Sequence, residues 1–128
     1  MKHIAITENH LYSKAYAKGG KAVTKSVIVY ALKDLKAKRL MLAHPMKQFV
    51  NRIGLTVSKK IGKATVRNRV KRVIREGLRQ TEKSFSTKKG YLLVLVARPA
   101  IIEMKSTQVA QDIERALKSL KIIDNENN

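Results

Sequence analysis

The stretch "VRNRVKRVIRE", residues 66–76, places five basic side chains in eleven positions, with one Asn between two Arg. Apolar residues recur through and just beyond it at the spacing of one helical face: Val66, Val70, Val73, Ile74 and Leu78. This spacing predicts a helix over residues 64–80. The apolar stripe needs a covering layer, so the elements on either side of the helix decide the fold.

A strand is predicted on each side of this helix. "RIGLTVSKK", 52–60, precedes it, and a turn follows in which Gly62 can supply an unusual backbone angle. "GYLLVLVARP", 90–99, is a continuous apolar run, which is typical of a strand buried on both faces and stopped here by Pro99. The strand-helix-strand crossover over 52–99 predicts a two-layer α/β sandwich.

The rest of the chain reads as one domain of 128 residues. The other predicted elements are, in chain order, a helix over 8–18 with Thr7 as N-cap and Gly19-Gly20 as its stop, a short strand near 21–23, a strand over 26–32, and a helix over 106–121. Residues 33–51 fit either a helix before Pro45 or a long basic loop. The polar end "DNENN", 124–128, is expected to be a frayed tail.

The charge balance limits the classes of partner. With 28 Lys and Arg against nine Asp and Glu, the formal net charge is +19, and such self-repulsion favours a polyanionic partner. No apolar run is long enough for a membrane span, and the first residues lack a signal-peptide core, so no membrane partner is expected. The absence of cysteine excludes disulfides and thiolate sites and suits a cytoplasmic protein.

The polar side of the 64–80 helix is almost entirely cationic. Asn68, Lys71, Arg72, Arg75 and Arg79 cluster there, and Arg67 and Arg69 lie at its two edges. Glu76 is the one acid within 64–80, with Arg72 as its expected partner. A solvated face would mix both signs, whereas a face rich in Arg suits phosphate. Together with Lys59, Lys60 and Lys63 before the helix, the face predicts a surface for RNA or DNA.

The first helix carries a different signal. Tyr12 and Tyr16 are four residues apart on one face and are flanked in sequence by Lys14 and Lys18. Such tyrosines can stack unpaired bases while lysines hold the backbone, or they can simply pack on the sheet. Both readings are open on residue type alone. Tyr30 and Tyr91 are expected to be core or rim residues of strands.

No catalytic residue and no metal ligand is predicted. The three histidines are scattered, and the acids form no pair or cluster at ligand spacing. No P-loop or Gly-rich dinucleotide turn is present, so no small-molecule substrate is expected. The residues alone therefore predict a nucleic-acid-binding domain without its own active site. A ribosomal protein, an RNA chaperone and a DNA-binding architectural protein all fit that description.

The motif "IGKATVRNRVKRVIRE", 61–76, resembles the protein component of bacterial ribonuclease P. The residues that fit the family pattern are Ile61, Ala64, Arg67, Asn68, Arg69, Val70, Lys71, Arg72 and Arg75. "LYSKAYAKGGK", "RIGLTVSKK" and "VARPAIIEMKSTQVAQDIERAL" also resemble the family's elements, so the likeness covers about residues 8–121. Both aromatics of the first helix are Tyr where Phe is frequent, and the 33–51 segment is longer than in many relatives.

The resemblance implies an α+β fold in the order α-β-β-β-α-β-α, with a left-handed strand-helix-strand crossover, like the second domain of ribosomal protein S5. It implies a catalytic RNA partner that uses Mg²⁺ to cut the 5′ leader from precursor tRNA, so that this chain is the accessory subunit of an endoribonuclease. The residues expected to dock on the RNA subunit are Lys59, Lys60, Lys63, Arg67, Asn68, Arg69, Lys71, Arg72 and Arg75. Those expected to hold the leader are Tyr12, Tyr16, Lys14 and Lys18.

Overall fold

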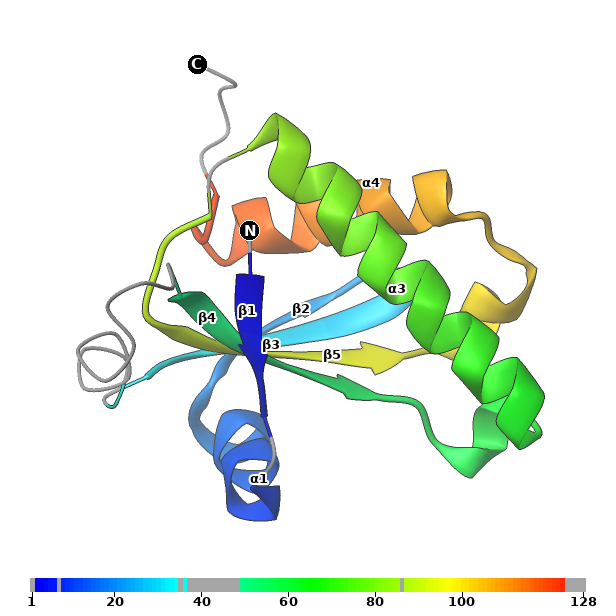
Figure 1. Cartoon of the computed structure of the whole chain (residues 1–128), viewed down its shortest axis with the longest axis horizontal. Helices are drawn as coiled ribbons and strands as arrows, with labels where there is room; N and C mark the ends of the chain where they lie inside the picture. The colour runs from blue at the N-terminus through cyan, green and yellow to red at the C-terminus, as the bar shows by residue number, and fades with distance from the viewer. Residues whose placement is uncertain (1, 7, 35, 37–48, 86, 124–128) are drawn as a thin grey trace.

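The computed structural model describes residues 2–6, 8–34, 36, 49–85 and 87–123 of the chain (Figure 1). The described elements are, in chain order, β1 (Lys2–Ala5), α1 (Asn9–Lys18), β2 (Gly20–Val23), β3 (Val27–Lys33), β4 (Phe49–Thr56), the 3-10 helix η1 (Lys59–Ile61), α3 (Ala64–Ser84), β5 (Tyr91–Ala97), the 3-10 helix η2 (Pro99–Glu103) and α4 (Ser106–Ser119). From α1 onward, the order α-β-β-β-α-β-α is the one predicted.

The strands form one mixed sheet in the order β1-β4-β5-β3-β2. β4 is parallel to both β1 and β5, while β3 is antiparallel to β5 and β2 is antiparallel to β3. Because β4 and β5 are adjacent and parallel, α3 is the crossover between them. The predicted crossover is therefore present, and its left-handed sense stays a prediction.

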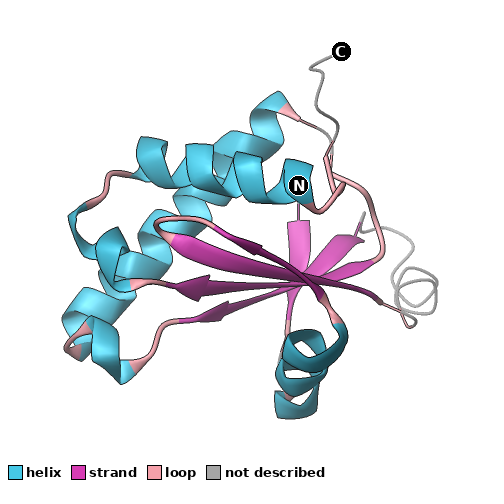
Figure 2. Ribbon diagram, turned by 180° about the vertical axis from the view of Figure 1, so that it is seen from behind, coloured by secondary structure: helices cyan, strands magenta, loops and turns pink. Residues whose placement is uncertain are grey.

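Helices cover both faces of the sheet. α3 and α4 lie on one face, and α1 lies on the other (Figure 2). On the α3 and α4 face, Ile74, Ile113 and Leu95 belong to one fully buried cluster. On the α1 face, Leu11 and Val94 belong to a second, smaller cluster. β5 contributes side chains to both clusters, which confirms the prediction of a strand buried on both faces.

Tertiary contacts move several element ends away from their predicted positions. β1 was not predicted, because "KHIA" is too short to show a pattern and forms only against β4. α3 continues past the predicted end at 80 because Thr81 is buried and its hydroxyl donates to the carbonyl of Ala110 in α4 at 3.1 Å. α4 ends before 121, since Lys121 adopts a left-handed φ of 61° that turns the chain back.

The turns before α1 and α3 differ in how well the sequence predicted them. Glu8 occupies the N-cap position of α1 without a side-chain cap, and the predicted cap, Thr7, lies outside the described residues. β4 runs from Phe49 only to Thr56, and the two lysines at 59–60 form a 3-10 turn instead of continuing the strand. Gly62 has a φ of 153°, so the unusual backbone angle predicted there is confirmed.

A buried ion pair lies where the ambiguous 33–51 segment leaves and rejoins the sheet. Arg52 Nε donates to Asp34 Oδ2 at 2.6 Å, and a terminal nitrogen of Arg52 donates to Oδ1 at 2.8 Å. The side chains are 10% and 3% exposed, respectively. The pair therefore ties the end of β3 to β4, whereas residues 35 and 37–48, on which the choice between helix and loop depends, lie outside the described residues.

Candidate RNA-binding site

The cationic face of α3 has two edges that differ in structure. A terminal nitrogen of Arg69 donates to the carbonyl oxygen of Ile102 in η2 at 2.6 Å, so Arg69 braces the chain between β5 and α4. Arg67 is half-buried at the other edge, and its Nε is buried with no hydrogen-bond partner among the described residues. Asn68 and Arg72 lie between the two edges and are exposed. The middle of the face is therefore free for an anionic partner.

Lysines extend this face beyond the start of α3. Lys59 and Lys60 lie in η1, Lys63 is the N-cap residue of α3, and all three are exposed. The Lys63 side chain makes no cap hydrogen bond, and the first turn of α3 contains no acid. The free N–H groups and the positive dipole end of the helix therefore add to the charge of the lysines. The name "basic strip" refers below to these three lysines with Arg67, Asn68, Arg69, Lys71, Arg72 and Arg75.

The pairing of Glu76 differs from the prediction. Its carboxylate accepts hydrogen bonds from Arg79, three residues later in the helix, and not from Arg72. The hydrogen bonds from Arg79, and then from Gln80, lower the pKa of Glu76 from 4.5 to about 2. Because α3 is longer than predicted, it contains Glu82 as a second acid. No described residue forms an ion pair with Arg72, which leaves its guanidinium available.

The tyrosines of α1 face the sheet beside β3 and β4. The Tyr16 hydroxyl and Oγ1 of Thr56 share a hydrogen bond of 2.7 Å. The Tyr16 ring meets the Tyr30 ring of β3 edge-on, with centroids 5.0 Å apart and planes at 68°. Even so, 40% of Tyr16 remains exposed. The ring is therefore held in place while part of its surface is free for a partner.

Tyr12 lies deeper than Tyr16, against β4. A Cβ at Gly54 would lie 2.6 Å from Cε1 of the Tyr12 ring and from its hydroxyl oxygen, so the absent side chain makes room for the ring. Burial, and then the neighbouring Tyr16, raise the pKa of Tyr12 above its usual value of 10.0. Its hydroxyl is therefore protonated at neutral pH and can donate a hydrogen bond. We call Tyr12, Tyr16 and Tyr30 the tyrosine face.

The predicted lysine partners of these tyrosines are placed elsewhere. Lys14 and Lys18 each follow a tyrosine by two residues, which is about 200° around a helix. Both are exposed, and this angle puts each of them on a different side of α1 from its tyrosine. Lys21 of β2 lies beside the tyrosine face instead, with its Nζ 5.9 Å from the centroid of the Tyr30 ring.

The sequence did not predict Tyr30 as a member of the tyrosine face, or Lys21 and Thr56 as its neighbours. The two-residue period of the predicted strand was the available signal, because it places Tyr30 with Ile28 and Leu32 on one side of the sheet, as the burial of β3 shows. The pairing of Lys21 with Tyr30 in the β2–β3 ladder, and the approach of Thr56, depend on strand register. Only the folded sheet fixes that register.

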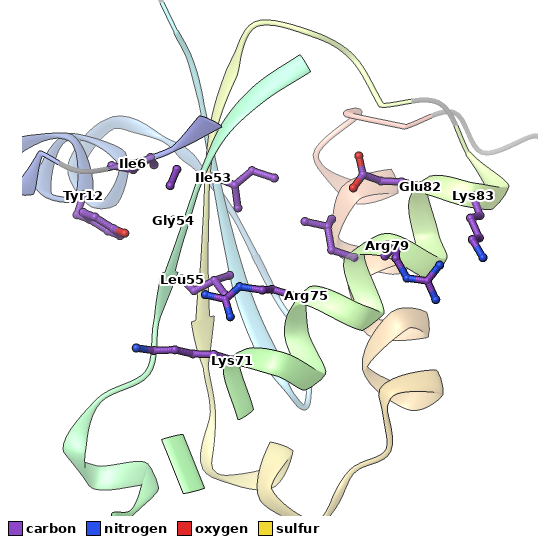
Figure 3. A pocket seen from close by; sticks show the side chains of 12 residues that line it. Ile6, Tyr12, Ile53, Gly54, Leu55, Lys71, Arg75, Arg79, Glu82 and Lys83 are labelled. Atoms are coloured by element: carbon purple, nitrogen blue, oxygen red, sulfur yellow. The ribbon is translucent and has the colours of Figure 1, made fainter. Parts of the chain in front are cut away.

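One cavity of about 710 Å³ joins the two predicted sites (Figure 3). Tyr12 and Gly54 line it at one end, and Lys71 and Arg75 of α3 line it at the other. The remaining lining residues are Ala5, Ile6, Ile53, Leu55, Leu78, Arg79, Glu82 and Lys83. Lys71 and Arg75 thus face the strand next to the tyrosine face, whereas Arg69 faces η2.

The two buried carboxylates of the described residues are both paired. Among the described residues, no group of three or more His, Cys, Asp or Glu side chains could hold a metal ion. Asp112 is buried and accepts hydrogen bonds from the backbone N–H and the hydroxyl of Ser26, at 3.1 and 2.7 Å. Asp34 is held by Arg52. These two buried carboxylates therefore stabilise the fold.

None of the helices in the described part of the chain is both long enough and apolar enough to span a bilayer.

Comparisons with known proteins agree with this geometry. The family model described as ribonuclease P matches residues 1–121. The ribonuclease P protein component of Clostridium acetobutylicum is 35% identical over 94% of this chain and 87% of its own length. The corresponding protein of Brevibacillus brevis is 32% identical over 92% of this chain and 83% of its own length. The solved structure of the Staphylococcus aureus RNase P protein is 26% identical and superposes with a TM-score of 0.72, over 96% of this chain and all of that one. The chain therefore belongs to the bacterial ribonuclease P protein family, the protein component of the endoribonuclease that takes part in tRNA 5′ maturation.

Proposed function

We propose that the chain binds the catalytic RNA subunit through the basic strip and holds the single-stranded 5′ leader of precursor tRNA on the tyrosine face. Family membership implies an RNA subunit as partner. The residues assigned to that RNA are Lys59, Lys60, Lys63, Arg67, Asn68, Arg69, Lys71, Arg72 and Arg75. The leader is assigned to Tyr12, Tyr16, Lys14 and Lys18, with Tyr30 added.

The observation that carries this proposal is the state of Tyr16. Its hydroxyl is fixed by Thr56 and its ring by Tyr30, yet 40% of the residue is exposed. A ring that only filled the core would be covered. A ring that is fixed and partly open loses little entropy when a base stacks on it, and stacking tolerates any base sequence.

The hydrolysis itself belongs to the RNA in this proposal. Mg²⁺ supplies charge neutralisation and an activated water when it is bound to RNA phosphates. Two observations support this assignment: no three His, Cys, Asp or Glu of the described residues form a group that could hold a metal ion, and the buried Asp34 and Asp112 are paired with Arg52 and Ser26. The role of the protein is to place cations along RNA phosphates, which lowers the Mg²⁺ concentration that the RNA needs. The expected place of action is the cytoplasm.

Binding of precursor and mature tRNA to the assembled RNA-protein complex tests the proposal. Tyr16→Ala is expected to weaken precursor binding by about 1–3 kcal/mol, which is the loss of one stacked base. Mature tRNA has no leader, so its affinity should not change. An equal loss for both RNAs would show that Tyr16 contacts the tRNA body or the RNA subunit, and the assignment of the leader to the tyrosine face would be withdrawn.

A further inference from the structure

A row of four cations runs along the side of α3 that faces β4. Lys71, Arg75, Arg79 and Lys83 are each four residues apart, and all four line the cavity described above (Figure 3). Four residues of helix rise about 6 Å and turn about 40° beyond a full turn, so the row climbs gradually around α3. Its second half, Arg79 and Lys83, lies beyond the basic strip and is not accounted for by docking of that strip.

The cavity has an apolar floor under this cationic rim. Ile53 and Leu55 of β4 and Leu78 of α3 line it, and all three belong to or pack against the main core cluster. Glu82 is the one acid in the lining, against the four cations of the row, of which Arg79 also forms an ion pair with Glu76 outside the lining. The volume of about 710 Å³ is in the range of small-ligand sites, about 300–1,000 Å³. An apolar floor with a cationic rim fits a nucleotide, which has a flat base and an anionic phosphate.

The edge of β4 connects this cavity to the tyrosine face. β1 pairs with β4 only as far as Ile53, whose carbonyl accepts a hydrogen bond of 3.0 Å from Ile6 N. The next residue, Gly54, has no side chain on the α1 side, where the Tyr12 ring lies. The cavity lining therefore includes Tyr12 from one face of the sheet and the α3 row from the other. An extended chain can cross the sheet edge at this point.

We propose that the RNA strand stacked on the tyrosine face continues over β4 at Gly54 into this cavity, so that α3 holds a second segment of the leader. Phosphates of that segment meet the row from Lys71 to Lys83, and one unstacked base lies on Ile53, Leu55 and Leu78. The inference rests on the proposed function and extends it, because it gives the leader a binding site on both faces of the sheet. It also gives Lys71 and Arg75 a leader contact in addition to their place in the basic strip.

The chemistry favours single-stranded RNA over an acidic peptide. Two of the four cations are arginines, whose planar guanidinium groups bind phosphate through paired hydrogen bonds. The tyrosine at the other end of the same cavity offers a stacking surface, which bases use and carboxylates do not. A duplex cannot use the apolar floor, because its base faces are already stacked. Unpaired nucleotides use the floor, the rim and the tyrosine together.

A series of precursor tRNAs with leaders from about 2 to about 10 nucleotides, within the range of single-strand sites, tests the inference. The test protein carries Arg79→Gln and Lys83→Gln, which remove charge but keep long stems and an amide that can donate to Glu76. The matched control carries Lys88→Gln and Lys89→Gln, which remove the same charge from two exposed lysines outside the cavity. Affinity for each precursor is measured on the assembled RNA-protein complex, with thermal melting as a check that both variants fold.

For the wild type and the control, affinity is expected to rise with leader length until the cavity is filled. The affinity of the double variant should equal that of the wild type for the precursor with the shortest leader and for mature tRNA. It should not rise as the leader becomes longer. With the longest leader, the logarithm of the double variant's binding constant should fall less steeply with the logarithm of the salt concentration. The slope should be smaller by up to about 1.4, which corresponds to two single-strand phosphate contacts at about 0.7 each. Gly54→Ala should behave differently, because its Cβ displaces Tyr12 of the tyrosine face: affinity should fall for every precursor that has a leader and stay unchanged for mature tRNA.

Other results would overturn the inference. A loss that is equal at all leader lengths and in mature tRNA would assign Arg79 and Lys83 to the RNA subunit or the tRNA body. Unchanged RNA affinity, together with lost binding of a fluorescent poly-glutamate peptide, would make the cavity a peptide groove. Either result leaves the tyrosine face untouched. Failure of the proposed function looks different, because the wild type would then bind precursor and mature tRNA equally and Tyr16→Ala would have no effect.

Discussion

Tyr12 of α1 and Arg75 of α3 line the same cavity from opposite faces of β4. The sequence places them in two separate predicted sites, one for the leader and one for the RNA subunit. The sheet brings these sites together at its edge, where β1 stops pairing and Gly54 leaves a gap. A substrate strand and the catalytic RNA can therefore be held on adjoining surfaces of one small protein.

The middle of the cationic face and its Arg69 edge should respond differently to truncation. Arg72→Ala is expected to weaken binding to the RNA subunit and to reduce the log-log salt slope by up to about 0.7–0.9, with no change in protein stability, because Arg72 is exposed and no described residue forms an ion pair with it. Arg69→Ala should also cost about 1 kcal/mol of unfolding free energy, since it removes the hydrogen bond to Ile102. Salt-dependent binding and urea unfolding measure the two effects. An unchanged slope for Arg72→Ala would mean that this side chain touches no phosphate.

The hydroxyl and the ring of Tyr16 should be separable. Tyr16→Phe removes the hydrogen bond to Thr56 and keeps the ring, so it should cost no more than about 0.5–1.5 kcal/mol of stability and leave most of the precursor affinity. Thr56→Val removes the same hydrogen bond from the other side and is the matched control. Binding of precursor tRNA by both variants checks this. If Tyr16→Phe proves as damaging as Tyr16→Ala while Thr56→Val is silent, the hydroxyl itself contacts the RNA and stacking is not the main contribution.

The buried pair at the ends of the 35–48 segment should control stability. Asp34→Ala leaves Arg52 buried without its partner, which is expected to cost about 3–5 kcal/mol of unfolding free energy. The double replacement Asp34→Leu with Arg52→Met removes both charges and should recover most of that loss. Urea unfolding of the single and double variants gives both values. A double variant as unstable as the single one would show that shape, rather than the unpaired charge, sets the cost.

Glu76 should restrain RNA binding through Arg79. Glu76→Gln removes a negative charge beside the cation row and releases the Arg79 guanidinium from its ion pair, so the affinity for RNA should rise. The folded-state pKa of about 2 lies below the usual 4.5, so the stabilising effect of the pair is present above pH 4.5 and is lost as the pH falls towards 2. Between pH 5 and 8 the carboxylate is ionised throughout. The gain measured in RNA titrations should therefore be the same at pH 5.5 and pH 8, and a gain confined to one pH would point to another titrating group.

The elements with a strong internal pattern are the ones that the sequence predicted well. The apolar spacing of α3 and the continuous apolar run of β5 each follow from residues within the element, and both are found where expected. β1 has no such pattern, because its four residues are ordered only by pairing with β4. The last turn of α3 likewise depends on α4, through the buried hydroxyl of Thr81.

The candidate site shows the same division between local and long-range information. The cationic face of α3 could be read from its sequence, since helical periodicity alone gathers those side chains. The partner of Glu76 was predicted wrongly as Arg72, because both candidate positions are within reach and only the folded helix shows that Arg79 is chosen. Tyr30, Thr56 and Gly54 joined the tyrosines through strand register and sheet packing, which connect residues far apart in the chain.

The most direct test of the account is cleavage of a precursor tRNA by a matching catalytic RNA at limiting Mg²⁺, with and without this protein. If the RNA carries out the hydrolysis while the protein shields phosphates and binds the leader, addition of the protein should raise the cleavage rate, most strongly at the lowest Mg²⁺ concentration. Extra Mg²⁺ should shrink that advantage as metal ions replace the cations of the basic strip. A cleavage rate that does not change with the protein, at any Mg²⁺ concentration, would contradict the account.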